Sequence, residues 1–244
     1  MLLEDLGNVI KTYRTRLGFT QNDLASALQV SPQAVSKWER GENAPDIAML
    51  PALSELLGAS VDTLLCSRWR EKRTVEASVV FADMENFSDL AMALPPADLA
   101  IALNTWFYPV TEHMLARDGL PIKCIGDELL CVFVGERHRE RAFMAIFEAR
   151  TAVTAPTRFS IASGPVWMGP LGHPLHARPD VLGGTVNLAS ALQPWAKRRA
   201  PSLVAASAGA VDPVRSRLSL GFSESVPVPG SAEPATFHEV LGIS

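Results

Sequence analysis

The sequence has 244 residues, enough for one large domain or for a small and a medium-sized domain that each enclose a core. Hydrophobic residues make up 48% of it, no apolar run could span a membrane, and the first residues do not resemble a signal peptide, so we expect a cytoplasmic protein without membrane contact. The formal net charge of −4 excludes a protein that is basic throughout, so any affinity for nucleic acid must come from a local surface.

The first 66 residues have the hydrophobic spacing of short helices. Five helices are predicted, over residues 2–17, 21–28, 32–40, 46–57 and 61–65. Thr20 and Ser31 have N-cap side chains, and Pro32 stands at a first helical position, where its missing N–H costs nothing. The residues expected to face the core are Leu6, Ile10, Tyr13, Leu17, Val35, Trp38, Ile47, Leu50 and Leu53. The pattern predicts an all-α domain over residues 1–66.

Two segments of this domain carry a resemblance to a known family. LGFTQNDLA over 17–25 and VSPQAVSKWERG over 30–41 resemble, in order and spacing, the Cro and phage-repressor family of helix-turn-helix proteins. The resemblance covers residues 1–66 and implies a sequence-specific transcription regulator. By that resemblance the helix over 32–40 enters the major groove of operator DNA, and the helix over 21–28 crosses the DNA backbone.

The resemblance also implies which side chains bind DNA. Gln33 and Lys37 would read bases, because Gln pairs with adenine and Lys donates to guanine. The other contacts are assigned to Lys11, Gln21, Ser36, Arg40 and Asn43. Since residues 1–66 hold five Lys/Arg and eight Asp/Glu, a helical bundle that contacts only protein is the alternative.

A short basic segment follows this domain. Residues 67–73 contain four Lys/Arg and one acidic residue. We predict a basic linker over 67–74, which either is a solvated connection or adds contacts to DNA phosphates.

From Thr74 the period of the hydrophobic pattern changes, and Val75, Ala77, Val79 and Phe81 alternate as in a strand. The predicted elements are a strand over 75–83, a helix over 96–114, strands over 120–125 and 129–134, a helix over 137–150, and a pair of short apolar runs over 159–162 and 166–168. Gly126, Asp127 and Glu128 form the turn of a hairpin. This β-α-β-β-α-β order predicts an α+β ferredoxin-like sandwich.

The polar residues of this region indicate magnesium or manganese rather than zinc. Asp83 ends one predicted strand and Asp127 lies in the hairpin turn, so neighbouring strands would bring the two carboxylates together against a triphosphate. Cys66, Cys124 and Cys131 lack the spacing of zinc ligands and of a disulfide framework. We expect all three thiols to be small buried hydrophobes.

Four segments in this order resemble the class III adenylate and guanylate cyclase catalytic domain. They are FADMENF over 81–87, KCIGD over 123–127, SGPV over 163–166 and DVLGGTVNLAS over 180–190. The resemblance extends across roughly 75–240, so a cyclase-type domain is predicted over 75–244. In that family two protomers build the sites between them, which implies a homodimer.

The resemblance implies a role for each matching residue. Asp83 and Asp127 would bind Mg²⁺ or Mn²⁺, with the backbone N–H groups of Met84, Glu85, Asn86 and Phe87 around the terminal phosphates. Lys123 and Asp180, from the other protomer, would recognise the edge of a purine, in the combination that selects adenine. Asn187 would orient the ribose and is the one candidate for a catalytic residue. The ligand would be a purine nucleotide or a cyclic nucleotide.

Two positions depart from the family pattern. Ala191 stands where an Arg usually neutralises the α-phosphate, and Pro229 stands where a Lys usually holds the outer phosphates. Arg198 or Arg199 could replace them only if that helix or its end were rebuilt, because Pro194 disfavours a simple continuation of the helix. Three functions stay open: a DNA-binding regulator that binds a nucleotide with weak or no turnover, an active adenylate cyclase that forms cyclic AMP and pyrophosphate from ATP, and a ligand-free dimerisation scaffold.

Overall fold

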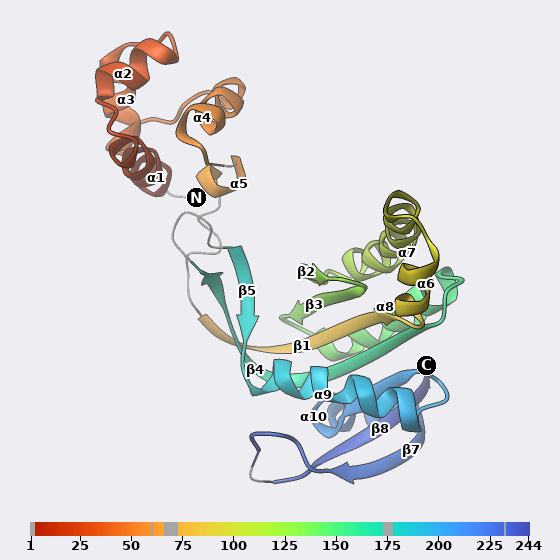
Figure 1. The fold of residues 1–244 in the computed structure, drawn as a ribbon. Coiled ribbons are helices and arrows are strands. Elements are labelled where there is room, and N and C mark those ends of the chain that lie inside the picture. Colours follow the sequence, from red (N-terminus) through yellow and green to blue (C-terminus); the bar gives the residue numbers. More distant parts are fainter. Residues whose placement is uncertain (1–2, 60, 66–72, 173–177, 232) are drawn as a thin grey trace. The chain divides into compact units, whose positions relative to one another are not determined.

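The computed structural model describes residues 3–59, 61–65, 73–172, 178–231 and 233–244 (Figure 1). The chain divides into two compact units, Met1–Lys72 with Gly169–Pro179 and Arg73–Met168 with Asp180–Ser244. Most of the predicted basic linker, together with Cys66, lies outside the described residues. Among the helices of the described part, none is long and apolar enough to cross a membrane.

The N-terminal unit contains the helices that the hydrophobic spacing predicts. They are α1 (Leu3–Arg16), α2 (Gln21–Ala27), α3 (Pro32–Glu39), the 3₁₀ turn η1 (Ile47–Met49), α4 (Leu50–Leu57) and α5 (Val61–Leu65). Thr20 caps α2 in a capping box with Asp23, and Ser31 caps α3 by accepting a hydrogen bond from the Ala34 N–H. The caps therefore fix where the second and third helices begin.

Two core assignments in this unit are wrong. Leu17 lies after the end of α1 and is 48% exposed, and Ile47 is 82% exposed. The predicted helix over 46–57 is divided into η1 and α4 because Pro51 stands in the first turn of α4 and cannot donate a backbone hydrogen bond to the preceding turn. The other predicted core residues, such as Ile10 and Val35, are buried. Leu24, which is fully buried, lies in the same core.

The second unit is built on an open mixed sheet. Its elements are β1 (Arg73–Met84), α6 (Phe87–Ala93), α7 (Pro96–Ala116), β2 (Leu120–Ile125), β3 (Glu128–Val134), α8 (His138–Ala152), β4 (Thr157–Leu171), β5 (Arg178–Leu182), α9 (Gly184–Arg199), β6 (Val204–Ser207), α10 (Ala208–Val211), η2 (Asp212–Arg217), β7 (Leu218–Val226) and β8 (Ala235–Ile243). The strand order is β2-β3-β1-β4-β6-β8-β7, with β5 paired to β4. Along this order β4 and β6 pair in parallel, and the other neighbours pair antiparallel.

The first part of this sheet confirms the ferredoxin-like prediction. Its strands lie in the order β2-β3-β1-β4, with β1 between β3 and β4, as a β-α-β-β-α-β sandwich requires. The two apolar runs around Ser163 and Pro165 form one continuous strand, β4, rather than a pair. Gly164 has no side chain there, and a Cβ at this position would lie 2.9 Å from Thr185 Oγ1, so the strand and α9 can approach closely.

Helices cover both faces of the sheet (Figure 1). On one face Phe159 and Ile161 of β4 share a core with residues of α7 and α8, among them Val110 and Phe143. Ser160 points to the other face, where its Oγ donates a hydrogen bond to the Ala189 carbonyl of α9. Because side chains alternate along a strand, the same short segment of β4 anchors both layers.

Two further expectations are corrected in this unit. Helix α9 runs to Arg199 with Pro194 inside it, so the proline does not end the helix. Proline removes one backbone donor, but Pro194 lies on the exposed side, while Trp195 and Ala196 are buried and hold the helix on the sheet. Cys131 is buried as expected, whereas Cys124 is exposed because it lies on the edge strand β2.

Candidate functional site

The strand register brings the two predicted metal carboxylates together. Asp83 near the end of β1 pairs with Glu128 at the start of β3, and the Met84 N–H donates to the Asp127 carbonyl at 3.3 Å. A pocket of about 330 Å³ opens here, and we call it the carboxylate pocket. Its lining residues are Asp83, Met84, Glu85, Asn86, Phe87, Ser88, Asp89, Asp127, Arg158 and Lys197.

Arg158 of β4 is a central residue of this pocket that the sequence analysis missed. Its Nη2 donates to Asp83 Oδ1 at 2.6 Å, its Nη1 to Glu85 Oε1 at 2.5 Å, and its Nε to Gln193 Oε1 at 2.5 Å. The side chain is only 9% exposed, so it is held firmly by these three acceptors. A cation bound by Asp83 would therefore compete with this guanidinium.

Burial and crowding of carboxylates raise pKa values in the pocket. Burial raises the pKa of the Asp83 carboxyl; Arg158 opposes this rise, and Asp127 and Glu85 add to it. Burial also raises the pKa of Glu128 to about 7, with further contributions from Asp83 and Asp127. Burial is the larger cause of both rises, and the neighbouring carboxylates add to it.

Lys197 brings a second cation to the pocket from the last turn of α9. Its Nζ lies 3.6 Å from Glu85 Oε2, and its side chain is 60% exposed. The lining thus has four carboxylates, those of Asp83, Glu85, Asp89 and Asp127, against two cations.

This charge balance fits a divalent cation. The described residues contain no cluster of three His, Cys, Asp or Glu that could hold a metal by themselves. Mg²⁺ is usually bound by one or two carboxylates together with phosphates and water, so Asp83 and Asp127 are a sufficient protein contribution.

Fewer backbone N–H groups are available to bind phosphates than the sequence predicts. The N–H groups of Met84 and Glu85 already donate to the carbonyls of Asp127 and Pro156, at 3.3 and 2.9 Å. Within the described residues, those of Asn86 and Phe87 have no backbone acceptor. The expected cradle of four N–H groups is therefore reduced to two.

The predicted base-recognition residues form a second cluster. Lys123 Nζ of β2 donates to Asp180 Oδ2 of β5 at 2.7 Å, and Asp180 Oδ1 accepts from the Val181 N–H at 2.8 Å. Asn187 is exposed in the first half of α9. None of the three is among the described residues that line the carboxylate pocket. The two groups of predicted site residues thus do not line one common pocket of this chain.

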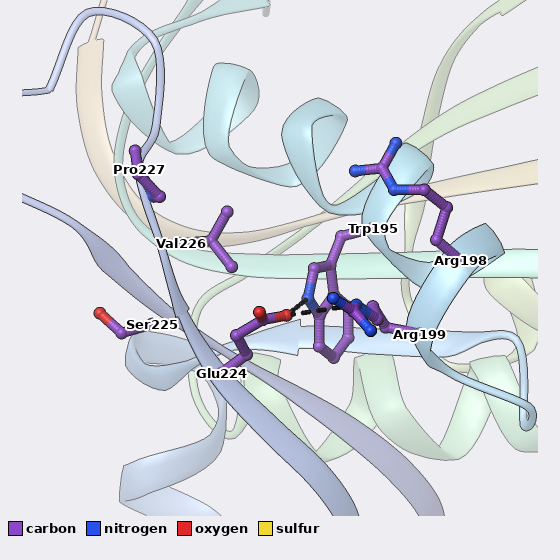
Figure 2. A pocket seen from close by; sticks show the side chains of 7 residues that line it. All are labelled: Trp195, Arg198, Arg199, Glu224, Ser225, Val226 and Pro227. Carbon is purple, nitrogen blue, oxygen red and sulfur yellow. Dashed lines mark hydrogen bonds and ion pairs between the residues drawn. The ribbon is translucent and has the colours of Figure 1, made fainter.

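Neither Arg198 nor Arg199 replaces the missing cations in the carboxylate pocket. Both line a different pocket of about 170 Å³, beside Trp195 and Glu224 (Figure 2). Arg199 Nε lies 3.7 Å from Glu224 Oε2, which also accepts a hydrogen bond from Trp195 Nε1 at 2.9 Å, while Arg198 points away from Glu224. Pro229 lies in the connection between β7 and β8.

In the N-terminal unit, α3 presents the expected face. Gln33 and Lys37 are exposed, Ser36 is half-buried, and Val35 and Trp38 are buried. The helix is therefore amphipathic, with both predicted base readers on its solvent side.

The neighbours of these readers are engaged within the unit. Arg40 is exposed but paired with Glu42, its Nε lying 2.6 Å from Glu42 Oε1, and Asn43 Oδ1 accepts from the Ala44 N–H at 2.9 Å. Gln21 Nε2 donates at 2.8 Å to Glu39, which forms a buried ion pair with Arg14. Gln21 thus links α2 to α3, and only its remaining donor could reach a phosphate.

Comparison with known proteins gives two family matches. The helix-turn-helix family matches residues 10–64, and the adenylate and guanylate cyclase catalytic domain family matches residues 70–237. Adenylate cyclase 1 of Rhizobium meliloti (strain 1021) is 27% identical over 157 residues, which are 57% of this chain and 23% of that protein. The HTH-type transcriptional activator BcrR of Enterococcus faecalis is 33% identical over 81 residues, 33% of this chain and 36% of that protein.

A solved structure shows the same fold. The adenylyl cyclase CyaB from P. aeruginosa is similar with a TM-score of 0.63 at 20% identity, covering 71% of this chain and 97% of that one. The chain spans about a quarter to about a third of the two curated relatives named above.

Proposed function

The chain belongs to the family of adenylate and guanylate cyclase catalytic domains, and we propose that it is a transcription regulator whose cyclase-type domain binds a purine nucleotide with little or no turnover. Its helix-turn-helix domain, over 1–66, binds operator DNA in this proposal. The basic linker over 67–74 connects it to the cyclase-type domain over 75–244. The helix-turn-helix match and the exposed face of α3 support the first part of the proposal.

The observation that carries the nucleotide part is that the chain contains both the carboxylate pocket and the Lys123–Asp180 ion pair. Asp83 and Asp127 share a pocket whose charge suits Mg²⁺ or Mn²⁺, and Lys123 is paired with Asp180 as a base-recognition pair. When bound, the metal would neutralise charge on the phosphates. A domain that served only as a dimerisation scaffold would have no need for either arrangement.

The two half-sites support a homodimer. Because Lys123 and Asp180 do not line the carboxylate pocket of their own chain, a second copy is needed to complete each site. Sedimentation of the full chain should give a dimer at micromolar concentration. A monomer that still binds nucleotide at full stoichiometry would rule out the shared site.

Weak turnover is proposed because two phosphate-facing cations are absent. Ala191 on α9 cannot neutralise charge at the α-phosphate, and Pro229 cannot hold the outer phosphates. The loss of one preorganised donor at a developing charge lowers the rate by about 10²–10³-fold. The remaining residues would still bind metal, base and ribose. The domain can therefore bind a nucleotide without converting it.

Calorimetry with the purified chain tests the proposal. ATP, GTP, cyclic AMP and adenosine are titrated with and without Mn²⁺. We expect a purine nucleotide to bind and Asp180→Ala to weaken it. The absence of heat and of a thermal shift for every nucleotide would refute the nucleotide part.

An active adenylate cyclase is the second candidate. It is favoured by the two cations that the carboxylate pocket does contain, Arg158 and Lys197. ATP with Mn²⁺ should then give cyclic AMP and pyrophosphate in a multiple-turnover assay. Cyclic AMP below one equivalent per site after prolonged incubation would favour the regulator without turnover.

A further inference from the structure

Among the described residues that line the carboxylate pocket, the two cations, Arg158 and Lys197, are held very differently. Arg158 is only 9% exposed and is held by Asp83, Glu85 and Gln193, so it cannot move without breaking three interactions. Lys197 is 60% exposed, and within the described part of the chain its one ion pair is a long contact of 3.6 Å to Glu85. A flexible ammonium with so weak an attachment can change partners at little cost.

We propose that Lys197 binds the outer phosphates of a nucleotide whose metal is held by Asp83 and Asp127 of the same protomer. This inference rests on the proposed function and specifies its ligand as a purine nucleoside di- or triphosphate. Phosphate recognition thereby lies in the metal-binding half of the site. The half of the site that contains Lys123 and Asp180 contributes contacts to the base.

The geometry of α9 supports this role. Lys197 lines the carboxylate pocket and lies one turn after Gln193, whose Oε1 accepts a hydrogen bond from Arg158 Nε, so both side chains lie on the same face of α9. The continuation of α9 through Pro194 is what brings Lys197 to this place. Arg198, the next residue, points to the other pocket instead.

Glu85 would act as the resting partner of Lys197. Its Oε1 accepts from Arg158 and its Oε2 lies near Lys197. A bound phosphate offers a more highly charged acceptor in the same pocket, so the ammonium exchanges a carboxylate for a phosphate without losing its ion pair. Glu85 stays neutralised by Arg158 after the exchange.

The first test compares ligands that differ in phosphate charge. In the full chain with Mn²⁺, Lys197→Ala should weaken ATP binding about 10-fold, because one charge-assisted hydrogen bond is lost. The affinity for adenosine should not change, and Lys197→Arg should retain most of the ATP affinity. Arg198→Ala removes an adjacent exposed charge and should leave ATP affinity unchanged.

The second test determines which half of the shared site contains Lys197. Two variant chains with different tags are co-expressed and the mixed dimer is purified. If Lys197→Ala is combined with Lys123→Ala, one site carries both changes and the other carries neither, so one wild-type ATP site per dimer is expected. If Lys197→Ala is combined with Asp83→Ala, each site carries one change, and no wild-type site is expected.

The outcomes separate this inference from the function on which it rests. Unchanged ATP affinity in Lys197→Ala, or the reverse pattern in the mixed dimers, overturns the role of Lys197 while the wild type still binds nucleotide. A wild-type chain that binds no nucleotide overturns the proposed function, and this inference with it.

Discussion

His138, the first residue of α8, couples the stability of the cyclase-type domain to pH. Its Nε2 lies 3.0 Å from Arg139 Nη1, and because Arg can only donate, this nitrogen accepts. Nδ1 then carries the proton and donates to Ser78 Oγ at 2.9 Å, which is 2.7 Å from Ser163 Oγ. Burial, with the charges of Arg139 and Arg141, lowers the pKa of His138 to about 4.

This shift predicts a loss of stability in acid. The imidazole is neutral in the folded chain down to about pH 4, whereas it takes up a proton near pH 6.5 when unfolded. Its contribution is therefore complete above pH 6.5 and is lost as the pH falls from 6.5 to 4. Between pH 7.5 and 5 the wild type should lose on the order of 2 kcal/mol more than His138→Asn, measured by urea unfolding. Parallel pH profiles for the two proteins would contradict this origin.

Ala191 offers a direct test of the proposed weak turnover. It lies one turn after Asn187 on α9, at the position of the missing cation. Ala191→Arg should raise the formation of cyclic AMP from ATP and Mn²⁺ about 10-fold or more, because it adds charge where charge develops. Ala191→Gln is the neutral control of similar length. An equal increase in both variants would show that charge is not the cause.

At the scale of single elements, α3 is the predicted DNA reader. Gln33→Ala and Lys37→Ala should each reduce the discrimination between operator and random DNA by roughly 1–3 kcal/mol, because they remove contacts to base edges. Lys11→Ala, at an assigned phosphate contact, should weaken binding to operator and to random DNA equally. It should also reduce the slope of log affinity against log salt concentration by about 1. Fluorescence anisotropy at several salt concentrations measures both. If the α3 variants behaved like Lys11→Ala, α3 would not read bases.

The elements also differ in how far the sequence predicts them. The ends of β1 and of the β2–β3 hairpin are predictable, because alternation and turn residues are local signals, and Asp83 and Asp127 follow from them. Arg158 carries no local signal, because it meets Asp83 only through the pairing of β4 with β1, 75 residues apart. The position of Lys197 could not be predicted, because Pro194 favours an earlier end of the helix. Burial of α9 against the sheet outweighs this local tendency of proline.

At the scale of the whole molecule, the proposed function requires that the two domains communicate. A homodimer that shares its nucleotide sites across an interface changes that interface when a nucleotide binds. In this proposal the same dimer carries two helix-turn-helix domains through a predicted linker of only eight residues, 67–74. Half-sites on DNA lie about 34 Å apart, so a rotation that displaces one DNA-binding domain removes the second contact.

We therefore expect nucleotide binding to change operator affinity by about 5–150-fold, the range of typical coupling free energies of about 1–3 kcal/mol. Linkage requires that operator DNA change nucleotide affinity by the same factor, because the two binding steps close one thermodynamic cycle. Calorimetric titration of ATP with Mn²⁺, with and without operator DNA, measures one side of the cycle, and DNA binding with and without nucleotide measures the other. Asp180→Ala should abolish the effect of nucleotide on DNA binding while leaving DNA binding itself intact, since Asp180 lies in the base-recognition pair. Equal affinities in all conditions, with both ligands bound, would show that the domains are uncoupled and that their fusion has another purpose.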